Sequence, residues 1–468
     1  MQVLAQKDLK HISLLFIFSI FFPIPGWSQE HTEARTDTVQ VHSIQELFSK
    51  GEFHGHVRNY FMATWNHQEL SDHYANASGA EIGIRTASLH GFSLGISGLF
   101  TYNLFSSNLV AKDPLAGKRP VTERELFDLQ DPDNKHDLDR LESAYIAFNS
   151  EKVQAKIGRF KFNSPLINPQ DTRMKPYTVQ GVQMQLPIRQ HTQLVFAWLD
   201  HFSPRSVVEW GKAKNTIGIY PMGSAQDGKP GAYANRLQTK GVAIGGVVYK
   251  SPGHQFQAQG WNYWIHNITN SSYGRLLLPV NKQLQVGVEG LYQFQVGNGG
   301  HQHPDTTYFP EQQQWLAGGM ISYKVCKAKM SLNYLHSGNS GRFTFPREWG
   351  REQFFATIPR GRLEGTGAAD LLVIKASKVW PAGFSSELSL ARAWHPAVSD
   401  YTHNKYGLVS YWSPIFDLTY QPNRQTFQGV VFRLLYVVKS SAGDELRLDQ
   451  MFYNTNFHQV NFITQINF

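Results

Sequence analysis

The feature that most constrains this chain is an alternation of apolar and polar residues that begins near Gly51 and continues to the last residue, Phe468. In the segments 92–100 and 284–295, most even positions are apolar and most odd positions are polar or glycine. Side chains of a strand point alternately to its two faces. Runs of about ten residues with one apolar and one mostly polar face are typical of antiparallel strands that cross a membrane.

Such segments recur along the whole chain after residue 52. The pattern predicts an all-β fold, a transmembrane antiparallel β-barrel of eighteen strands, an even number as in other bacterial barrels. The expected strands are 53–65, 80–89, 92–103, 140–149, 153–160, 179–188, 192–200, 240–250, 254–265, 272–278, 284–296, 314–325, 328–337, 369–379, 383–395, 403–412, 427–438 and 457–468.

The connections between these segments alternate between short and long. Short ones such as 150–152 and 189–191 contrast with long ones such as 104–139 and 338–368. Outer-membrane barrels have short periplasmic turns and long external loops, whereas a soluble β-sandwich has no reason for this rhythm. The connection 413–425 does not fit the alternation.

The last segment alternates up to Phe468, and a closing strand that ends on an aromatic residue resembles the signal that the barrel-assembly machinery recognises. Closure of the barrel also removes unpaired sheet edges, which lipid does not tolerate. We therefore expect the outer-membrane lipid and the assembly machinery among the partners, the latter through Phe468.

The N-terminus has the parts of a secretory signal peptide, with Lys7 and Lys10 before an apolar run over 12–22. The alternative, a membrane anchor, is disfavoured because the run is short for a spanning helix. The expected organisation is a signal peptide (1–28), a periplasmic leader (29–52) and a barrel (53–468). The sole cysteine, Cys326, excludes an internal disulfide framework.

The connection 161–178 differs from an ordinary hairpin loop. Pro165, Pro169 and Pro176 prevent a regular strand or helix there. The same stretch contains apolar residues, among them Ile167, that favour packing over exposure to water. We expect this loop to fold into the lumen of the barrel.

Three stretches resemble the OprD family of outer-membrane porins. They are Gly158-Arg159-Phe160 through Ser164-Pro165-Leu166-Ile167 and Asp171-Thr172-Arg173-Met174-Lys175-Pro176 to Thr178-Val179-Gln180-Gly181; Phe345-Pro346-Arg347-Glu348-Trp349-Gly350-Arg351-Glu352-Gln353-Phe354-Phe355 with Pro359-Arg360 and Glu364-Gly365; and the opening 51–61.

The resemblance implies a monomeric barrel of eighteen strands, with external loops folded into the lumen and a ladder of basic side chains that guides carboxylate-bearing solutes. Inward arginines are sparse on the strands of this chain, apart from Arg58, Arg85 and Arg433. The family function is a passive diffusion channel for small, carboxylate-bearing or peptide-like solutes.

A basic constriction is also expected on physical grounds, because a guanidinium in a narrow passage attracts carboxylates and binds them bidentately. The alternative is that the arginines of the loops, which include Arg360 and Arg362, pair with Asp171, Glu348, Glu352 and Glu364 and pin the loops. The residues assigned to the pore lining or constriction are Arg58, Arg159, Arg173, Lys175, Arg347, Arg351 and Arg433.

Other classes of function have less support in the sequence. A barrel hydrolase would have to use Asp200-His201, which as neighbours on a strand should face opposite ways. His301-Gln302-His303 lacks further ligands for a metal, and basic residues interleaved through loops do not indicate nucleic-acid binding. We expect no cofactor and no enzyme activity; an adhesin or receptor barrel remains the alternative to a porin.

Overall fold

The computed structural model describes residues 40–468 apart from 171, 255, 424, 444 and 445. The expected signal peptide (1–28) and residues 29–39 of the expected leader (29–52) lie outside the described residues. The described part of the leader forms strand β1 (Gln40–Val41), which pairs parallel with β4 (Ser88–Leu89), and helix α1 (Ile44–Ser49).

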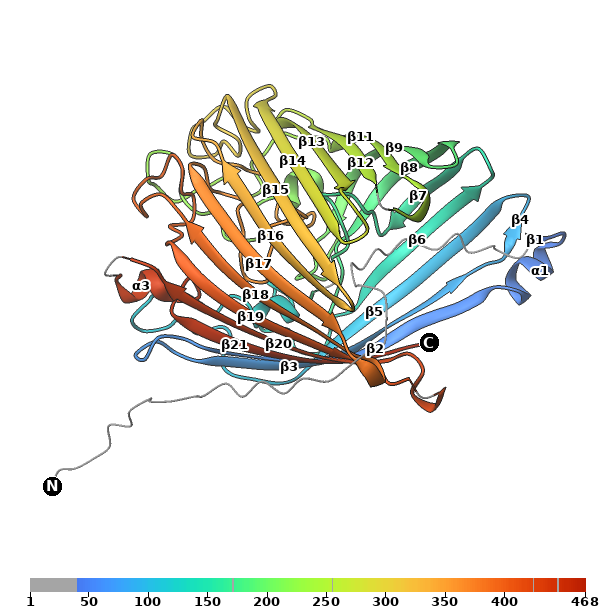
Figure 1. Ribbon diagram of the computed structural model, residues 1–468, viewed down its shortest axis with the longest axis horizontal. Coiled ribbons are helices and arrows are strands. Elements are labelled where there is room, and N and C mark those ends of the chain that lie inside the picture. Colours follow the sequence, from blue (N-terminus) through green and yellow to red (C-terminus); the bar gives the residue numbers. More distant parts are fainter. Residues whose placement is uncertain (1–39, 171, 255, 424, 444–445) are drawn as a thin grey trace.

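Eighteen long strands form a closed antiparallel barrel, as the alternation predicted (Figure 1). They are β2 (Glu52–Trp65), β3 (His73–Arg85), β5 (Phe92–Ser106), β6 (Arg140–Asn149), β7 (Gln154–Phe160), β8 (Thr178–Arg189), β9 (Thr192–Ser203), β11 (Val242–Lys250), β12 (Gln257–Ile265), β13 (Thr269–Pro279), β14 (Leu284–Gln295), β15 (Gln313–Val325), β16 (Ala328–Ser337), β17 (Ala369–Val379), β18 (Phe384–Trp394), β19 (Tyr411–Tyr420), β20 (Val430–Ser441) and β21 (Phe457–Asn467).

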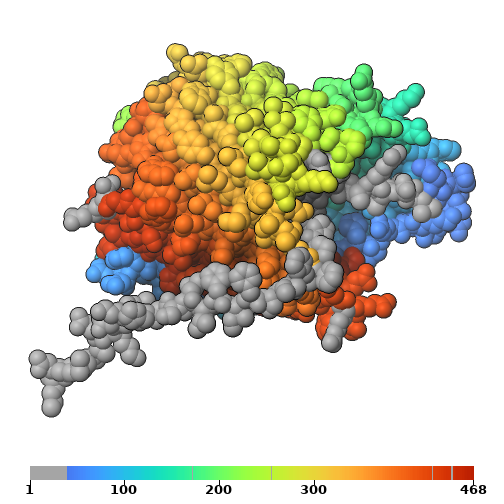
Figure 2. Space-filling model, in the orientation of Figure 1, coloured from blue at the N-terminus to red at the C-terminus, as the bar shows by residue number. Residues whose placement is uncertain are grey.

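Each of these strands pairs with its neighbours in the chain, and the first and last strands close the ring. β2 pairs with β21 from His56 opposite Asn467 to Trp65 opposite His458. The colours of Figure 2 follow this order around the outside of the molecule. No backbone edge of the long strands is therefore left without a partner strand, as a bilayer requires.

The remaining elements are short and lie in the connections. They are β10 (Gly211–Lys212), α2 (Ala213–Thr216), α3 (Leu448–Met451), η1 (Arg124–Leu126), η2 (Pro252–His254), η3 (Pro381–Gly383) and η4 (Gln425–Phe427). Within the described part of the chain, no helix is long and apolar enough to cross a membrane.

The two ends of the barrel differ in the length of their connections. At one end every connection has nine residues or fewer, and at the other end seven of the nine connections have fifteen or more. We call these the short-turn end and the long-loop end. The expected alternation of short and long connections is confirmed.

One expected strand, 403–412, is wrong in position. The corresponding strand is β19, which begins only at Tyr411, and residues 395–410 form a long-loop connection. Within this connection the Asn404 side chain bonds the main chain at Pro396 and Leu408. The strand includes Pro414, which cannot donate to the ladder, so the sequence obscured it. The shift also explains why the expected connection 413–425 did not fit the alternation of short and long connections. The turn that follows β19 is 421–429, which is short. Similarly, the expected strand 80–89 is β3, which begins at His73.

The outer face of the barrel is apolar. On β20, Tyr436 is 36% exposed, while Leu435 and Val437 on the inward face are at most 5% exposed. Exposed Ile, Val, Leu and Phe side chains recur around the outside, including Ile96, Val288 and Phe462. Soluble monomers rarely expose so much contiguous apolar surface, whereas lipid would cover it.

The interior is occupied on one side by the connections of the long-loop end. Phe162 and Ile167 of loop 161–177 share one buried cluster with Phe345 of loop 338–368 and with wall residues. The Trp349 ring stacks on Phe202 of β9, with ring centroids 4.1 Å apart. Loops 161–177 and 338–368 therefore fold inward and pack on the wall, in agreement with the expectation for 161–178.

The assignment of faces on β20 is tested by a pair of neighbouring substitutions. Leu434 lies on the outward face, opposite Phe462 of β21, and Arg433 lines the interior. Leu434→Arg should cost about 2–4 kcal/mol at mid-bilayer depth and impair assembly, whereas Arg433→Leu should assemble. Mobility on unheated detergent gels measures folding of each variant, and equal assembly of the two would contradict the assignment.

Candidate solute passage

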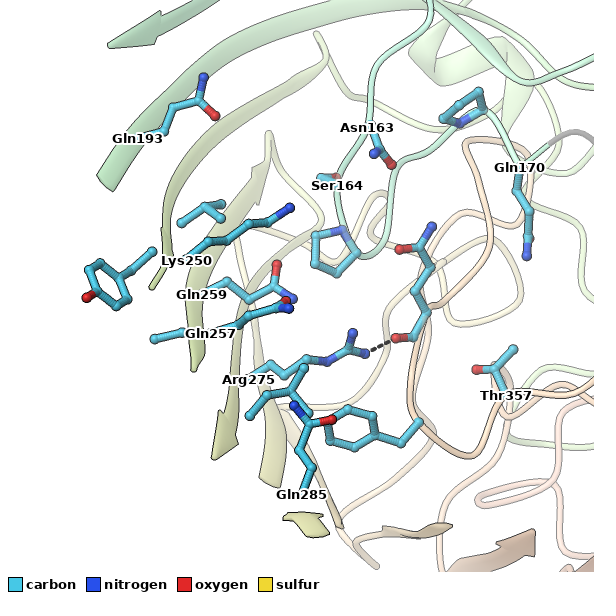
Figure 3. A pocket seen from close by; sticks show the side chains of 18 of the residues that line it. Asn163, Ser164, Gln170, Gln193, Lys250, Gln257, Gln259, Arg275, Gln285 and Thr357 are labelled. Atoms are coloured by element: carbon cyan, nitrogen blue, oxygen red, sulfur yellow. Dashed lines mark hydrogen bonds between the residues drawn. The ribbon is translucent and has the colours of Figure 1, made fainter. Parts of the chain in front are cut away.

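Two adjoining cavities lie in the interior. The larger, about 2470 Å³, is lined by inward residues near the short-turn end, such as Gln154, Gln257 and Lys378. We call it the vestibule, and part of its wall is seen in Figure 3. The smaller, about 200 Å³, lies between loops 161–177 and 338–368 and the inner faces of β2, β19, β20 and β21. The two cavities share six lining residues, so the smaller one opens into the vestibule.

The narrowing is built where the two loops cross. Asn168 Nδ2 donates to the main-chain carbonyl of Arg351 at 2.7 Å, and the Gln353 amide donates to the carbonyl of Pro165 at 3.0 Å. Gly350 lies so close to loop 161–177 that a Cβ at this position would be 2.7 Å from the main-chain nitrogen of Asn168. The glycine therefore permits the close crossing that holds both loops beside the smaller cavity.

Guanidinium groups dominate the charge of the smaller cavity, which we call the arginine cavity. Two come from the wall, one from loop 161–177 and two from loop 338–368. They are Arg58, Arg433, Arg173, Arg351 and Arg360.

The two wall arginines have different partners. Arg58 donates to Gln465 Oε1 on the neighbouring strand at 2.9 Å and to the main-chain oxygen of Arg173 at 2.6 Å. Arg433 donates to Asp417 Oδ1 at 2.9 Å, so part of its charge is compensated. Arg58 thus ties the folded loop to the wall as well as lining the cavity.

Arg173 is paired to an acid that the sequence analysis did not consider. Its Nη2 lies 2.7 Å from Glu125 Oε2, and Arg205 approaches the same oxygen at 2.8 Å. Burial alone would raise the pKa of Glu125, but the charges of Arg205 and Arg173 outweigh burial and hold the pKa at about 2. Asp171, the partner proposed from the sequence, lies outside the described residues.

The two arginines of loop 338–368 are bound to uncharged acceptors. Arg351 donates to the carbonyls of Ile358 and Gly361. Arg360 donates to the side-chain oxygens of Gln459 and Asn461 on β21.

Both side chains stay charged at neutral pH. Burial lowers the pKa of Arg351 to about 10, and burial together with the charge of Arg173 lowers the pKa of Arg360 to about 9. Arg360 also has a φ of 58°, a left-handed backbone conformation that costs about 1–3 kcal/mol in a residue other than glycine. The sequence placed Arg360 in the basic cluster of this loop but not among the constriction residues.

Two expected lining residues are buried among the loops instead. Lys175 Nζ donates to the carbonyl of Phe127 at 3.0 Å. Arg347 lies over the Tyr406 ring, 4.9 Å from its centre, and 3.7 Å from Glu364. Neither side chain lines the arginine cavity or the vestibule. These two residues therefore hold the loops in place, as the alternative interpretation has it, and do not line the passage.

Arg159 requires a correction, because it lies on the outer face of the barrel. Phe160 points inward and is 1% exposed, while Ile157, two residues before Arg159, is 55% exposed. The Arg159 guanidinium stacks over Trp210, 4.7 Å from the ring centre, and donates to Gln180 at 3.0 Å. The strand register therefore turns this arginine away from the interior.

The other candidate centres offer no catalytic arrangement. Asp200 and His201 were expected to face opposite ways, but a register shift between β8 and β9 brings His201 Nδ1 within 3.0 Å of Asp200 Oδ1. Neither residue lines the vestibule or the arginine cavity. Among the residues that the structure describes, no group of three or more His, Cys, Asp or Glu side chains could hold a metal ion.

The fold is that of the eighteen-stranded outer-membrane channels. The chain is similar to Pseudomonas aeruginosa OpdK, solved with vanillate, at 15% identity and a TM-score of 0.66, over 90% of this chain and 99% of that one. It is similar to OccK9 (OpdG) of the same organism at 12% identity and a TM-score of 0.69, over 90% and 100% of the two chains.

A third similar structure is Acinetobacter baumannii OccAB4, at 11% identity and a TM-score of 0.69, over 89% of this chain and 98% of that one. These neighbours are OprD-family channels, so the fold that the motifs predicted is confirmed. Comparison of the sequence with protein-family models and with curated proteins gives no match.

The pairing of Arg173 predicts what its removal does. Removing one partner of a buried ion pair costs about 3–5 kcal/mol, part of which Arg205 offsets here. Arg173→Ala should therefore release loop 161–177 and give noisy single-channel currents, with little change in charge selectivity. Glu125→Gln, which keeps the arginine charge, should give similar noise. A shifted reversal potential at steady conductance in Arg173→Ala would contradict this staple role.

Burial lowers the pKa of Lys175 to about 7, against about 10.4 in an unfolded chain. Between these values the unfolded chain holds a proton that the folded protein lacks, so stability rises with pH through this window. Lowering the pH from 10 to 7 should therefore reduce the heat resistance of the wild type relative to that of the variant Lys175→Met. Gel mobility after heating at each pH measures this, and a pH-independent difference would contradict it.

Proposed function

We propose that the protein is an outer-membrane porin, a passive diffusion channel for small solutes, and that its narrowest part prefers carboxylate-bearing solutes. The observation that carries the proposal is the arginine cavity. Two inward loops and the barrel wall bring five guanidinium groups around about 200 Å³ that opens into a wide vestibule.

The charge balance of the arginine cavity favours anions. Asp417 compensates Arg433 and Glu125 compensates Arg173, whereas Arg351 and Arg360 have uncharged hydrogen-bond acceptors. A guanidinium does not lose its proton at neutral pH and presents a planar fork that matches a carboxylate. Because protein atoms surround the cavity on most sides, such charges are screened less there than in bulk solvent.

The likeness to known channels supports the same class of solute. The OpdK structure was solved with vanillate, an aromatic carboxylate. The long-loop end would face the exterior and the short-turn end the periplasm. The apolar outer face would contact lipid. At the short-turn end the Phe468 ring, the expected recognition element for assembly, lies 6.1 Å from the Phe53 ring.

The signal peptide, the periplasmic leader and the monomeric state remain predictions from the sequence and from the family resemblance. A barrel that serves as an adhesin or receptor would use its long loops without conducting ions. Reconstitution into a planar bilayer separates these functions, since absence of conductance would overturn the channel.

The arginine cavity predicts the ion selectivity of the reconstituted pore. A unit charge at a few ångströms contributes about 1 kcal/mol even in water, so Arg360→Ala should lower the permeability ratio of chloride over potassium about fivefold. Arg351→Ala should act in the same direction. Reversal potentials in asymmetric potassium chloride measure the ratio.

Arg159→Ala is the matched control for this measurement. It removes the same side chain from the outer face of the barrel, where the guanidinium stacks on Trp210. The control should leave the reversal potential unchanged. If Arg360→Ala and Arg159→Ala both gave the wild-type value, the arginine cavity would not set the selectivity.

A further inference from the structure

One side of the vestibule is lined by glutamine side chains. They come from four strands between β8 and β14, where the period-two alternation turns them inward. We call this surface the carboxamide wall, and it consists of Gln183, Gln185, Gln193, Gln257, Gln259 and Gln285. Figure 3 shows four of them, Gln193, Gln257, Gln259 and Gln285, on the wall side of the open space.

The loops across the space are also mainly polar and uncharged, with Lys161 and Glu352 as the charged side chains that line it. Asn163, Ser164 and Gln170 of loop 161–177 and Thr357 of loop 338–368 face the vestibule (Figure 3). Gln353 of the same loop also lines it. A solute between the wall and these loops is therefore surrounded mainly by amide and hydroxyl groups.

The wall contains basic side chains as well, but one of them is compensated. Arg275 Nη2 lies 2.8 Å from Glu289 Oε2, and the other basic residues of this side, Arg189, Lys250 and Lys282, stand at the short-turn end. By contrast, strands β15 to β17 turn lysines into the same vestibule, including Lys324, Lys329 and Lys378. The two sides of the vestibule thus differ in chemistry, one rich in carboxamides and the other in ammonium groups.

Carboxamides suit solutes that carry hydroxyl groups. A glutamine side chain offers two N–H donors and an oxygen acceptor, and a hydroxyl group likewise donates and accepts. Contacts within the wall orient the amides, since Gln193 Nε2 donates to Gln185 Oε1 at 2.8 Å and Trp261 Nε1 donates to Gln259 Oε1 at 2.9 Å. Each contact uses only part of the hydrogen-bonding capacity of these side chains.

An aromatic ring lies among the amides on the same surface. Trp261 of β12 lines the vestibule two residues from Gln259, to which its Nε1 donates. A ring presents an apolar face to the C–H groups of a polyhydroxylated molecule, while a neighbouring amide bonds its hydroxyls. A surface that contacts only water would not need an aromatic ring beside oriented amides.

We propose that the carboxamide wall is a binding site for the polyhydroxylated part of a solute, so that the preferred substrates are hydroxylated carboxylates of the sugar-acid type. The inference rests on the proposed channel function for the carboxylate, which the arginine cavity receives. The hydroxyl-bearing body of the solute is received by the wall.

The wall is tested with neutral solutes, which do not depend on the arginine cavity. Mannitol and triethylene glycol have the same number of carbon atoms but differ in hydroxyl content. In liposome swelling, wild type should admit mannitol faster relative to triethylene glycol than the variant Gln257→Leu/Gln285→Leu does. The ratio should fall about threefold to tenfold, as expected from one or two hydrogen bonds of ordinary strength.

Two controls accompany this variant. Gln257→Asn/Gln285→Asn keeps the carboxamides and should retain most of the wild-type ratio. Asn262→Leu removes an amide that bonds Asn270 on the outer face of β12 and should change nothing. Should the double leucine variant fail to fold on unheated gels, Gln183→Leu on β8 provides the same test.

Bi-ionic reversal potentials for gluconate against hexanoate test the complete proposal. Preference for gluconate in wild type, lost in the leucine variant while chloride preference persists, supports it. An unchanged mannitol ratio in the leucine variants overturns the wall as a binding site. A wild-type pore without chloride preference overturns the proposed function instead, and the neutral-solute ratio distinguishes that failure from failure of the wall.

Discussion

The closed ring of backbone hydrogen bonds is the constraint on which the other features depend. A bilayer offers no partner to an unpaired N–H or C=O group, so the first and last strands must pair, as β2 and β21 do. A ring of eighteen strands encloses a space too wide for wall side chains alone to fill. The connections of the long-loop end fill part of it, and what they leave open is the vestibule and the arginine cavity.

Packing loops inside a barrel brings charged side chains out of water, and the structure resolves that cost with buried ion pairs. Arg140 Nε lies 2.8 Å from Glu142 Oε2, and Arg342 Nε lies 2.9 Å from Glu311 Oε1. A buried charge without a partner would cost several kcal/mol, so each pair must form when the loops fold in. Arg342 also donates to the carbonyl of Ser224 and thereby joins two loops. These pairs stabilise one arrangement of the loops.

The sequence predicted the fold well because alternation is a local property of each strand. It failed at β19, where Pro414 broke the pattern, and at Asp200 and His201, where a register shift changed the face of a residue. Both failures arise from irregular backbone that a count of alternate positions does not detect.

The candidate site was less predictable, since it depends on contacts between distant segments. That Arg173 pairs with Glu125 follows from how two loops pack, and neither loop alone indicates the partner. The outward position of Arg159 could have been found, because Phe160 and Ile157 both belong to the alternation of β7. The family motif includes Arg159, but a motif does not indicate the face of the strand on which a residue lies.

The partners of the cavity arginines determine which of them can exchange a solute. A carboxylate that approaches Arg173 must compete with the carboxylate of Glu125, whereas one that approaches Arg360 competes only with the amide oxygens of Gln459 and Asn461. Both arginines make charge-assisted hydrogen bonds, but only the pair of Arg173 and Glu125 adds the attraction between opposite charges, so the second exchange costs less. Conduction requires sites that bind a solute and also release it. Arginines held by neutral acceptors meet both requirements, and we therefore assign selectivity in the proposed channel to Arg360 and Arg351, and loop anchoring to Arg173.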